Sequence, residues 1–181
     1  MTIKHAILGI LKDAPRHGYE MKNLFNEKVG DFWNLNYGQI YTTLDRLTKE
    51  GLVDWVEEEQ DSKPDKKVYY LSPKGDQELA WWLQQPLSKP RALRDELFIK
   101  LLFLDKDEPD KIYQLIEQQT EIYLNYMKEL TNKKYKLTKE GINRDNIITD
   151  LLMDAALFHA EADIRWLRHA EGKLKDYFNK G

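Results

Sequence analysis

The sequence contains no cysteine. Disulfide bonds and thiolate-bound metal sites are therefore excluded, and a small secreted domain held together by disulfides is not an option. No apolar run reaches the roughly 20 residues that a membrane-spanning helix requires. The first residues also lack the basic and apolar pattern of a cleavable signal peptide. Together these absences predict a cytoplasmic protein with no membrane partner.

An excess of basic residues is also missing. The 181 residues include 28 Lys and Arg against 31 Asp and Glu, a formal net charge of −3. Residues 1–85 contain 11 basic and 14 acidic side chains, and residues 86–181 contain 17 of each. Nucleic-acid-binding domains are often basic as a whole. Any affinity of this chain for DNA must therefore come from local clusters of Lys and Arg.

Motifs for catalysis and for metal binding are absent from the sequence as well. It has no HEXXH pair, no glycine-rich phosphate loop and no serine nucleophile elbow. Its four histidines are scattered at positions 5, 17, 159 and 169. His159 lies on a mostly apolar helical stripe with Asp163 one turn later, and packing explains it better than metal binding. We therefore expect no enzymatic activity and no cofactor.

Residues 1–85 begin with the pattern of three short helices. In each of them, apolar residues recur three and four positions apart, as they do on the inner face of a helix that packs on a core. These helices are predicted at residues 2–12, 18–29 and 36–50. Two successive helices joined by a tight turn are typical of a helix-turn-helix.

The spacing of the apolar residues changes after Gly51. Two β-prone runs follow, at residues 52–56 and 68–71, and the polar loop between them makes a β-hairpin the natural prediction. Ser72 and Pro73 then favour a new helix, because serine caps a helix and proline suits its first position. Three helices, a hairpin and a further helix are the elements of a winged helix-turn-helix.

Residues 92–181 are predicted to be helical and to follow a linker at residues 86–91. A short apolar helix is expected at 92–104, and longer ones at about 110–137 and 145–178. Because such helices bury little surface alone, we expect a symmetric dimer, with an intramolecular bundle as the alternative. Heptad-like stripes mark the long helices: Ile112, Ile116, Gln119, Tyr123, Tyr126 and Leu130, then Leu152, Ala155, His159, Ala162 and Trp166. The predicted fold is thus mostly α with a small β-hairpin wing, an N-terminal winged helix-turn-helix plus a C-terminal helical dimerisation domain.

The third predicted helix has the features of a DNA recognition helix. Asn36 can cap its start, and Gly51 can follow its end in a left-handed conformation. Ile40, Leu44 and Leu47 form its inner face. The opposite face carries small, hydrogen-bonding and basic residues, as a helix in the major groove of DNA does.

The outward face of this helix supplies most of the candidate DNA contacts. Gln39 can form two hydrogen bonds with an adenine, and Thr42 can contact a thymine methyl group. Gly38 lets the backbone approach the DNA, and Asp45 is expected to point away from the phosphates. A solvated helix face without a ligand is the alternative. The remaining candidates, for phosphate or base contacts, are Tyr37, Tyr41, Arg46 and Lys49.

Two further groups of candidates lie outside the third helix. Lys63, Lys66 and Lys67 at the tip of the hairpin can reach a neighbouring groove, and their phosphate contacts would add salt-dependent affinity. Lysines on a loop often serve solubility alone, which is the alternative for this group. Tyr19 opens the second helix, whose N-terminal amides can hold a phosphate. Packing against the third helix is an equally good role for Tyr19.

Three blocks of the sequence together resemble the PadR family of bacterial transcriptional regulators. They are KHAILGILKDAPRHGYEM, GDFWNLNYGQIYTTLDRLTKEGLV and KKVYYLSPKGDQELAWWL. The blocks resemble the first helix of the family with its HGY element, its GQIY-containing recognition helix, and its wing strand with the helix that follows. The chain length and the C-terminal helices resemble the longer subfamily, which includes phenolic-acid-responsive repressors.

The resemblance implies a homodimer that binds a two-fold related operator and represses adjacent genes. It also implies that the C-terminal helices pair the subunits, together with the first helix of the partner. In some members of the family, a small aromatic ligand binds between the two domains and releases the DNA. Aromatic residues such as Trp82 and Trp166 are candidates for lining such a pocket.

The expected function is therefore that of a sequence-specific DNA-binding transcriptional regulator, a homodimeric repressor released by a small-molecule effector. Its expected partners are a double-stranded operator, a second copy of the chain and a small aromatic effector. The alternative is a winged-helix module for protein–protein interaction without sequence-specific DNA binding. The acidic net charge of residues 1–85 favours this alternative.

Overall fold

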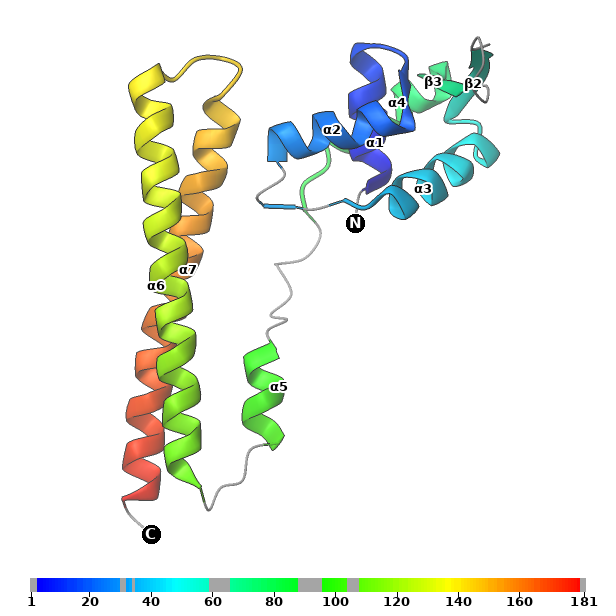
Figure 1. Ribbon diagram of the computed structural model, residues 1–181. Helices are drawn as coiled ribbons and strands as arrows, with labels where there is room; N and C mark the ends of the chain where they lie inside the picture. Colours follow the sequence, from blue (N-terminus) through cyan, green and yellow to red (C-terminus); the bar gives the residue numbers. More distant parts are fainter. Residues whose placement is uncertain are drawn as a thin grey trace. The chain divides into compact units, whose positions relative to one another are not determined.

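The computed structural model describes residues 3–29, 32–33, 35–58, 66–87, 96–103 and 108–179. The chain divides into two compact units, Met1–Pro90 and Arg91–Gly181 (Figure 1). Some predicted features lie outside the described residues: Lys63, the side chain of Lys66, residues 88–91 of the linker, and residues 92–95 and 104 of the apolar helix.

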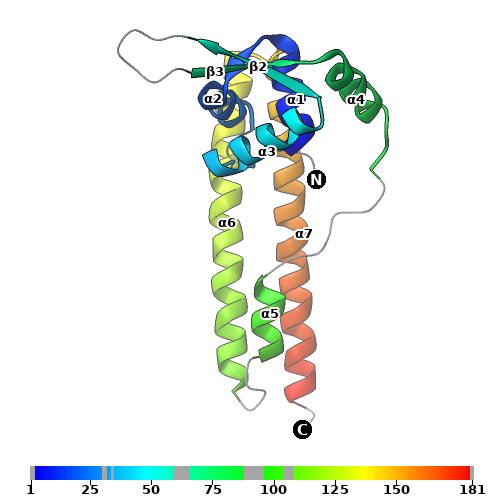
Figure 2. The same cartoon turned by 90° about the vertical axis from the view of Figure 1, so that its right-hand side faces the viewer.

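The described part of the first unit consists of four helices and a small antiparallel sheet. β3 lies between β1 and β2 in this sheet, and Figure 2 shows the two longer strands side by side. This mostly helical architecture confirms the predicted winged helix-turn-helix. In chain order the elements are α1 (Ile3–Asp13), β1 (Arg16–His17), α2 (Gly18–Val29), α3 (Tyr37–Lys49), β2 (Val53–Glu58), β3 (Lys66–Leu71) and α4 (Pro73–Leu83). We call the β2 and β3 pair the wing.

β1 is a strand that the sequence pattern does not predict. Its two residues, Arg16 and His17, pair antiparallel with Tyr69 and Val68 of β3. A segment of two residues shows no alternation of apolar and polar side chains, so only its pairing with a distant strand makes it part of the sheet. This pairing ties the start of α2 to the wing.

The predicted inner face of α3 forms part of the core of the first unit. Ile40, Leu44 and Leu47 are no more than 1% exposed, which confirms the prediction. The face of α3 opposite these residues is therefore turned to solvent. They pack in one cluster with Ile7, Leu8, Leu11, Met21, Phe25, Leu35, Leu52, Val53, Tyr69 and Leu79.

Caps define both ends of α3 as the sequence predicts. Asn36 Oδ1 accepts a hydrogen bond from the Gln39 N–H at 2.8 Å, and Gln39 Oε1 accepts one from the Asn36 N–H at 3.1 Å. This reciprocal capping box satisfies two backbone donors that the helix itself leaves unpaired. Gly51, just past the end, has a φ of 69°. The predicted start of α4 is also confirmed, because the Ser72 Oγ accepts from the backbone N–H of Gly75 at 3.0 Å.

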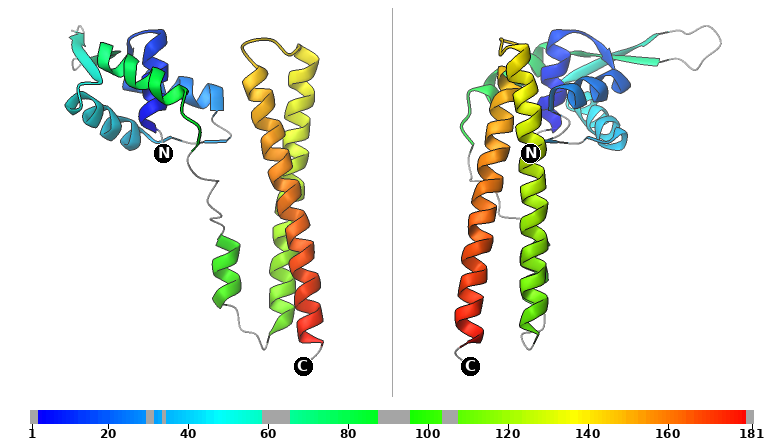
Figure 3. Two further views of the ribbon diagram at one scale, coloured as in Figure 1. Left: turned by 180° about the vertical axis from the view of Figure 1, so that it is seen from behind. Right: turned by 60° about the vertical axis from the view of Figure 1, so that its left-hand side comes forward.

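In its described residues, the second unit consists of two long antiparallel helices with a shorter helix packed against them (Figure 3). The elements are α5 (Glu96–Phe103), α6 (Pro109–Glu140) and α7 (Ile147–Phe178). Leu97 of α5 is buried in one cluster with residues of α6 and α7. No helix in the described parts of the chain combines the length and the apolar character that crossing a membrane requires.

The apolar stripes predicted on α6 and α7 differ in how far the structure buries them. On α6, Ile112, Ile116 and Leu130 of the predicted stripe are buried. On α7, Ala155, His159 and Ala162 of the predicted stripe are exposed, whereas Leu152 and Trp166 are partly buried, with Trp166 against the core cluster. The middle of this stripe is therefore not part of the face that α7 buries within the unit. The reason is that α7 carries apolar residues on two faces, and only one of them can face α6. The residues that α7 buries are Met153, Ala160, Ile164 and Leu167.

Candidate nucleic-acid interface

The outward face of α3 brings the predicted recognition residues onto one surface. This follows from the amphipathic pattern, because the inner face is held in the core while a helix places every third or fourth residue on the same side. The candidates on α3, every one of them exposed, are Tyr37, Gly38, Gln39, Tyr41, Thr42, Arg46 and Lys49.

Gln39 has a structural role beside its predicted contact with a base. Its Oε1 accepts the hydrogen bond from Asn36 that completes the capping box. The side-chain amide can still donate, and a carbonyl oxygen has a second lone pair, so the cap and an adenine contact are compatible. Gly38 supports the same cap, since a Cβ there would stand 3.3 Å from Asn36 Oδ1. The first turn of α3 is thus held in position by its own side chains.

Tyr19 of α2 packs against α3 and remains exposed. Its ring stacks on that of Tyr37, with 6.0 Å between the ring centroids and an interplanar angle of 10°. Lys22 Nζ lies 4.0 Å from the centroid of the Tyr37 ring. Packing, the second of the two roles predicted for Tyr19, is therefore observed, while its 58% exposure leaves it accessible to a phosphate. Lys22 is a candidate that the sequence reasoning missed, although it lies one turn after Tyr19 on α2.

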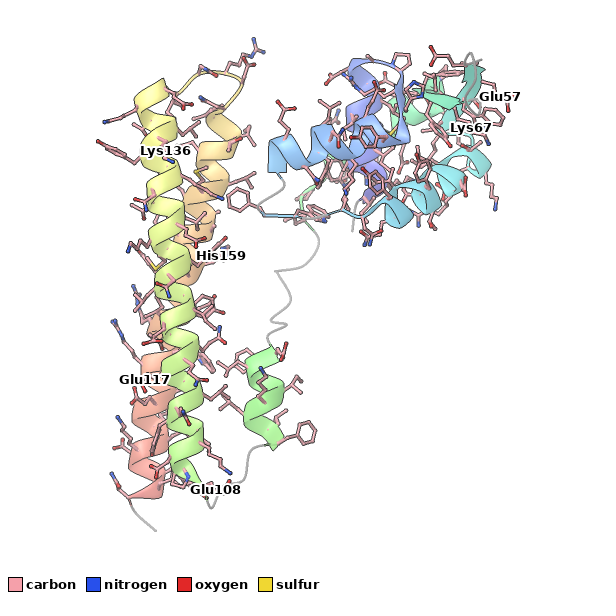
Figure 4. The ribbon with its side chains drawn as sticks, in the orientation of Figure 1. Glu57, Lys67, Glu108, Glu117, Lys136 and His159 are labelled. Atoms are coloured by element: carbon pink, nitrogen blue, oxygen red, sulfur yellow. The ribbon has the colours of Figure 1, made fainter. Side chains whose placement is uncertain are left out.

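In the wing, Lys67 lies beside an aromatic side chain. Lys67 faces Glu57 across the two strands, and Figure 4 labels both residues. Its Nζ lies 3.9 Å from the centroid of the Trp55 ring, a cation–π contact that limits the freedom of the lysine. Lys66 begins β3 opposite Glu58. Trp55 is a further residue that sequence reasoning missed, because its contact with Lys67 depends on strand register.

His17 links β1 to both strands of the wing. Its Nδ1 lies 3.1 Å from the backbone oxygen of Lys67, and its Nε2 lies 3.1 Å from Glu58 Oε2. The ring of His17 thereby joins β1 to β2 as well as to β3.

A groove of about 900 Å³ separates the start of α2 from α3 and the wing. Asp45 lines this groove, whereas the sequence reasoning placed it only as a residue turned away from phosphate. Burial, assisted by the nearby charges of Asp45 and Tyr41, raises the pKa of the Tyr69 hydroxyl. Tyr69 therefore stays neutral over the physiological range. The other lining residues are His17, Gly18, Tyr19, Glu20, Tyr41 and Lys67.

Metal-binding geometry does not occur in the described residues, where His, Asp and Glu form no group of three that could hold an ion. The chemistry that this surface offers is therefore that of hydrogen bonds, aromatic rings and scattered lysines. These are the groups through which proteins contact base edges and phosphates.

Comparison with known proteins assigns the family. Residues 7–81 match the model of the transcriptional regulator PadR-like family, and residues 93–175 match that of the virulence activator alpha C-terminal region. A probable transcriptional regulator of Mycobacterium tuberculosis, Rv1176c, is 30% identical over 189 residues, which cover 99% of this chain and 95% of the relative. The chain belongs to the PadR-like family of transcriptional regulators. The resemblance inferred from the three sequence blocks is thereby confirmed.

Structures of a Bacillus subtilis relative extend the PadR-like similarity to both units. Its negative transcriptional regulator PadR is 37% identical over 103 residues, a stretch that spans 57% of each chain. The crystal structure of that protein in complex with operator DNA has a TM-score of 0.76 at 27% identity, covering 96% of this chain and 97% of the other. Its complex with p-coumaric acid has a TM-score of 0.71 at 26% identity, covering 97% and 99%. This PadR-like protein is thus a transcriptional regulator in fold and in family.

Proposed function

We propose that this PadR-like protein is a homodimeric repressor that binds double-stranded operator DNA through α3 and is released by a small aromatic effector. The observation that carries the proposal is the shared outward face of α3, whose predicted recognition residues are exposed while its opposite face is buried. The operator complex of the Bacillus relative supports the same reading. Acting on DNA, the protein would work in the cytoplasm, and as a regulator rather than an enzyme.

Base recognition is assigned to the first two turns of α3. Gln39 and Thr42 would contact base edges in the major groove, where an amide can pair with adenine and a threonine can meet a thymine methyl group. Gly38 would let the backbone approach the DNA. The capping box already holds this turn in place in the free protein, which would reduce the conformational cost of binding.

Phosphate contacts are assigned to the residues around this centre. Tyr19 and Tyr37 form a stacked pair with Lys22 beside it, so that two hydroxyls and one ammonium group can meet one stretch of backbone. Tyr41 and Lys49 also lie on the exposed side of α3. Arg46 Nε is 3.8 Å from Glu50 Oε1, an exposed pair weak enough to exchange for a phosphate. On the wing, Lys63, Lys66 and Lys67 would reach a neighbouring groove.

Dimerisation is assigned to the second unit, with residues 1–85 binding DNA, 86–91 linking and 92–181 pairing the subunits. An apolar stripe remains exposed along α7, in which Ile148 is 61%, Leu151 53% and Phe158 67% exposed. Burying such side chains against a second copy contributes roughly 25 cal/mol per Å². We call this exposed apolar stripe the α7 stripe. Its residues are spaced three and four apart, as in a coiled coil, and they are Ile148, Leu151, Ala155, Phe158 and Ala162.

The proposed effector is based on Bacillus subtilis PadR. The structure of that relative with p-coumaric acid shows that a small phenolic acid binds a protein of this fold. A repressor needs some signal that releases it, and differential binding of a ligand to the free and DNA-bound states is the usual means. A small aromatic acid is therefore the first class of compound to test with this chain.

The decisive experiment measures binding of the full-length protein to DNA from upstream of its own gene and of the neighbouring genes. Fluorescence anisotropy should show binding to one such fragment that unrelated DNA does not compete away. The variant Lys63→Glu/Lys66→Glu/Lys67→Glu should lose most of this binding, because three phosphate contacts are replaced by repulsion. The matched control changes three exposed lysines of the second unit, Lys128, Lys136 and Lys173, to Glu and should keep it.

The same experiment separates this proposal from the alternative of a protein-interaction module. A module without sequence-specific DNA binding would show no preference among the fragments, and the wing variant would behave like the control. Either outcome would overturn the repressor proposal.

The dimer is tested by light scattering of Leu151→Glu/Phe158→Glu. Charges at two positions of the α7 stripe should yield monomers, since they would be buried without partners in the interface. Tyr135→Glu, on an exposed position of α6 outside the stripe, is the control and should leave the dimer intact. A dimer that survives both glutamates would place the interface elsewhere.

A further inference from the structure

The floor of the groove between α2, α3 and the wing has no part in the proposed DNA contacts. We propose that this groove binds an organic cation, an ammonium group attached to an aromatic or alkyl body, and that the bound cation competes with operator DNA. The first half of this proposal stands on the groove itself, and only the second half rests on the proposed function.

The floor of the groove is the hydroxyl end of Tyr69. This residue is only 4% exposed, yet it lines the groove, and its hydroxyl has no hydrogen-bond partner among the described residues. Because the hydroxyl oxygen is not one of the buried unpaired side-chain atoms of the described residues, it is reached by solvent. The hydroxyl is therefore available to a molecule that enters the groove, and Asp45 beside it favours its neutral, hydrogen-donating form.

Two carboxylates and one lysine are among the side chains that line the groove. Asp45 on α3 and Glu20 on α2 both line it. One oxygen of Glu20 accepts a hydrogen bond from the His17 backbone N–H at 2.8 Å, which leaves the carboxylate its charge and its second oxygen. The ammonium group of Lys67 lies against the Trp55 ring, and His17 is directed to the wing. The two carboxylates therefore favour a cation over an anion inside the groove.

The walls of the groove are tyrosine rings. Tyr41 is 44% exposed. Its ring lies so close to Gly18 that a Cβ on residue 18 would stand 2.7 Å from the ring. Tyr19 is 58% exposed at the other edge. The faces of aromatic rings attract ammonium groups, most strongly where a carboxylate is near. A volume of about 900 Å³ suits a small organic molecule, so the expected ligand is an organic cation rather than a bare ion.

Competition with DNA follows from shared residues. Tyr19 and Tyr41 line the groove and also belong to the proposed DNA surface. A molecule that occupies the rings and their surroundings would hold both side chains away from phosphate. By linkage, operator DNA would weaken binding of the cation by the same factor.

The test uses benzyltrimethylammonium as the probe and isothermal titration calorimetry of the full-length protein without DNA. Binding should saturate in the wild type. It should weaken about tenfold in Asp45→Asn, which removes one charge and keeps the shape, and more modestly in Tyr69→Phe, which removes only the hydroxyl. The control Glu27→Gln changes an exposed carboxylate on the same helix as Glu20 and should bind as the wild type does. Benzyl alcohol, the uncharged counterpart, should bind much more weakly.

Equal binding of the probe to wild type and Asp45→Asn would overturn the proposal that the groove binds a cation, provided that thermal unfolding shows the variant to be folded. Equal binding of benzyl alcohol, or no saturable binding, overturns it as well. Operator anisotropy with and without the probe then tests competition, which should disappear in Asp45→Asn. Failure of operator binding with intact, Asp45-dependent cation binding would count against the repressor proposal alone, so the two failures are distinguishable.

Discussion

The ring of Tyr41 in α3 rests on the backbone of Gly18 at the start of α2, so closely that a Cβ on residue 18 would lie 2.7 Å from the ring. Two helices of the helix-turn-helix therefore meet through a contact that leaves no room for a Cβ on residue 18 unless the ring of Tyr41 moves. This contact positions a tyrosine that belongs both to the proposed DNA surface and to the groove.

Gly18→Ala is expected to displace the exposed ring of Tyr41 and, because that ring can turn aside, to lower the free energy of unfolding by no more than about 1 kcal/mol. Operator affinity should fall as well. Urea unfolding and operator anisotropy measure the two effects. The control is Gly172→Ala on α7, where a Cβ meets no other described atom within 4 Å and alanine should stabilise the helix by up to about 1 kcal/mol. Unchanged stability and affinity in Gly18→Ala would show that Tyr41 moves aside freely.

Gln39 combines a cap with a base contact, and two substitutions separate these roles. Gln39→Ala should lose the cap, which lowers the free energy of unfolding by roughly 1 kcal/mol. It should also lose the base contact, which removes about 1–3 kcal/mol of discrimination at one base pair. Gln39→Glu should keep the stability, since glutamate also completes a capping box, and should still lose operator binding through repulsion. Competition assays with single-base operator variants, together with urea unfolding, measure the two. Full operator preference in both variants would remove Gln39 from the readout.

Gly75 lies where α4 meets the start of the wing, and a Cβ there would stand 2.1 Å from the backbone oxygen of Leu52. Because backbone must move to admit a methyl group, Gly75→Ala should destabilise the protein by at least about 3 kcal/mol. Thermal unfolding checks this. Gln77→Ala, at an exposed position of the same helix, should stay within about 0.5 kcal/mol of the wild type. Similar melting of both variants would contradict the packing described.

The carboxylate of Glu78 joins α4 to α1. Hydrogen bonds from Lys4 and His5 hold the pKa of Glu78 below its ordinary value of 4.5. A lowered pKa in the folded protein means that the contribution to stability is present above about pH 4.5 and is lost as the pH falls through the folded value. The pair is partly exposed, so this contribution should not exceed about 1 kcal/mol.

Glu78→Gln should therefore be less stable than the wild type at pH 6, and the difference should shrink towards pH 3. Urea midpoints across this range provide the measurement. Glu96→Gln, which removes a fully exposed pair with Lys100 within one helix, serves as the control and should show a smaller change. Parallel curves for wild type and Glu78→Gln would rule out this role of Glu78.

Local signals account for the success of the sequence-based predictions. Asn36, Gly51 and Ser72 act on neighbouring residues, so the start and end of α3 and the start of α4 could be predicted without knowledge of the fold. The apolar face of α3 is equally local, because helical spacing alone places Ile40 and Leu44 together.

Contacts between distant segments account for what was missed. β1 becomes a strand only by pairing with β3, and Lys22 becomes a candidate only because its ammonium group lies over Tyr37. On α7, two apolar faces compete for α6, and spacing cannot say which of them is buried. The register of the wing, which places Lys67 near Trp55, is likewise set by strand pairing.

The sequence by itself determined the order of the helices and of the two longer strands, the caps and the outward face of α3, since each depends on residues within a few positions of one another. Only the tertiary structure decided that Gly18, Asp45 and Tyr69 share a groove, and that the ring of His17 meets the backbone of Lys67, 50 residues away. The physical reason is that burial and hydrogen bonding between remote segments depend on how the chain folds back on itself, which no local pattern specifies.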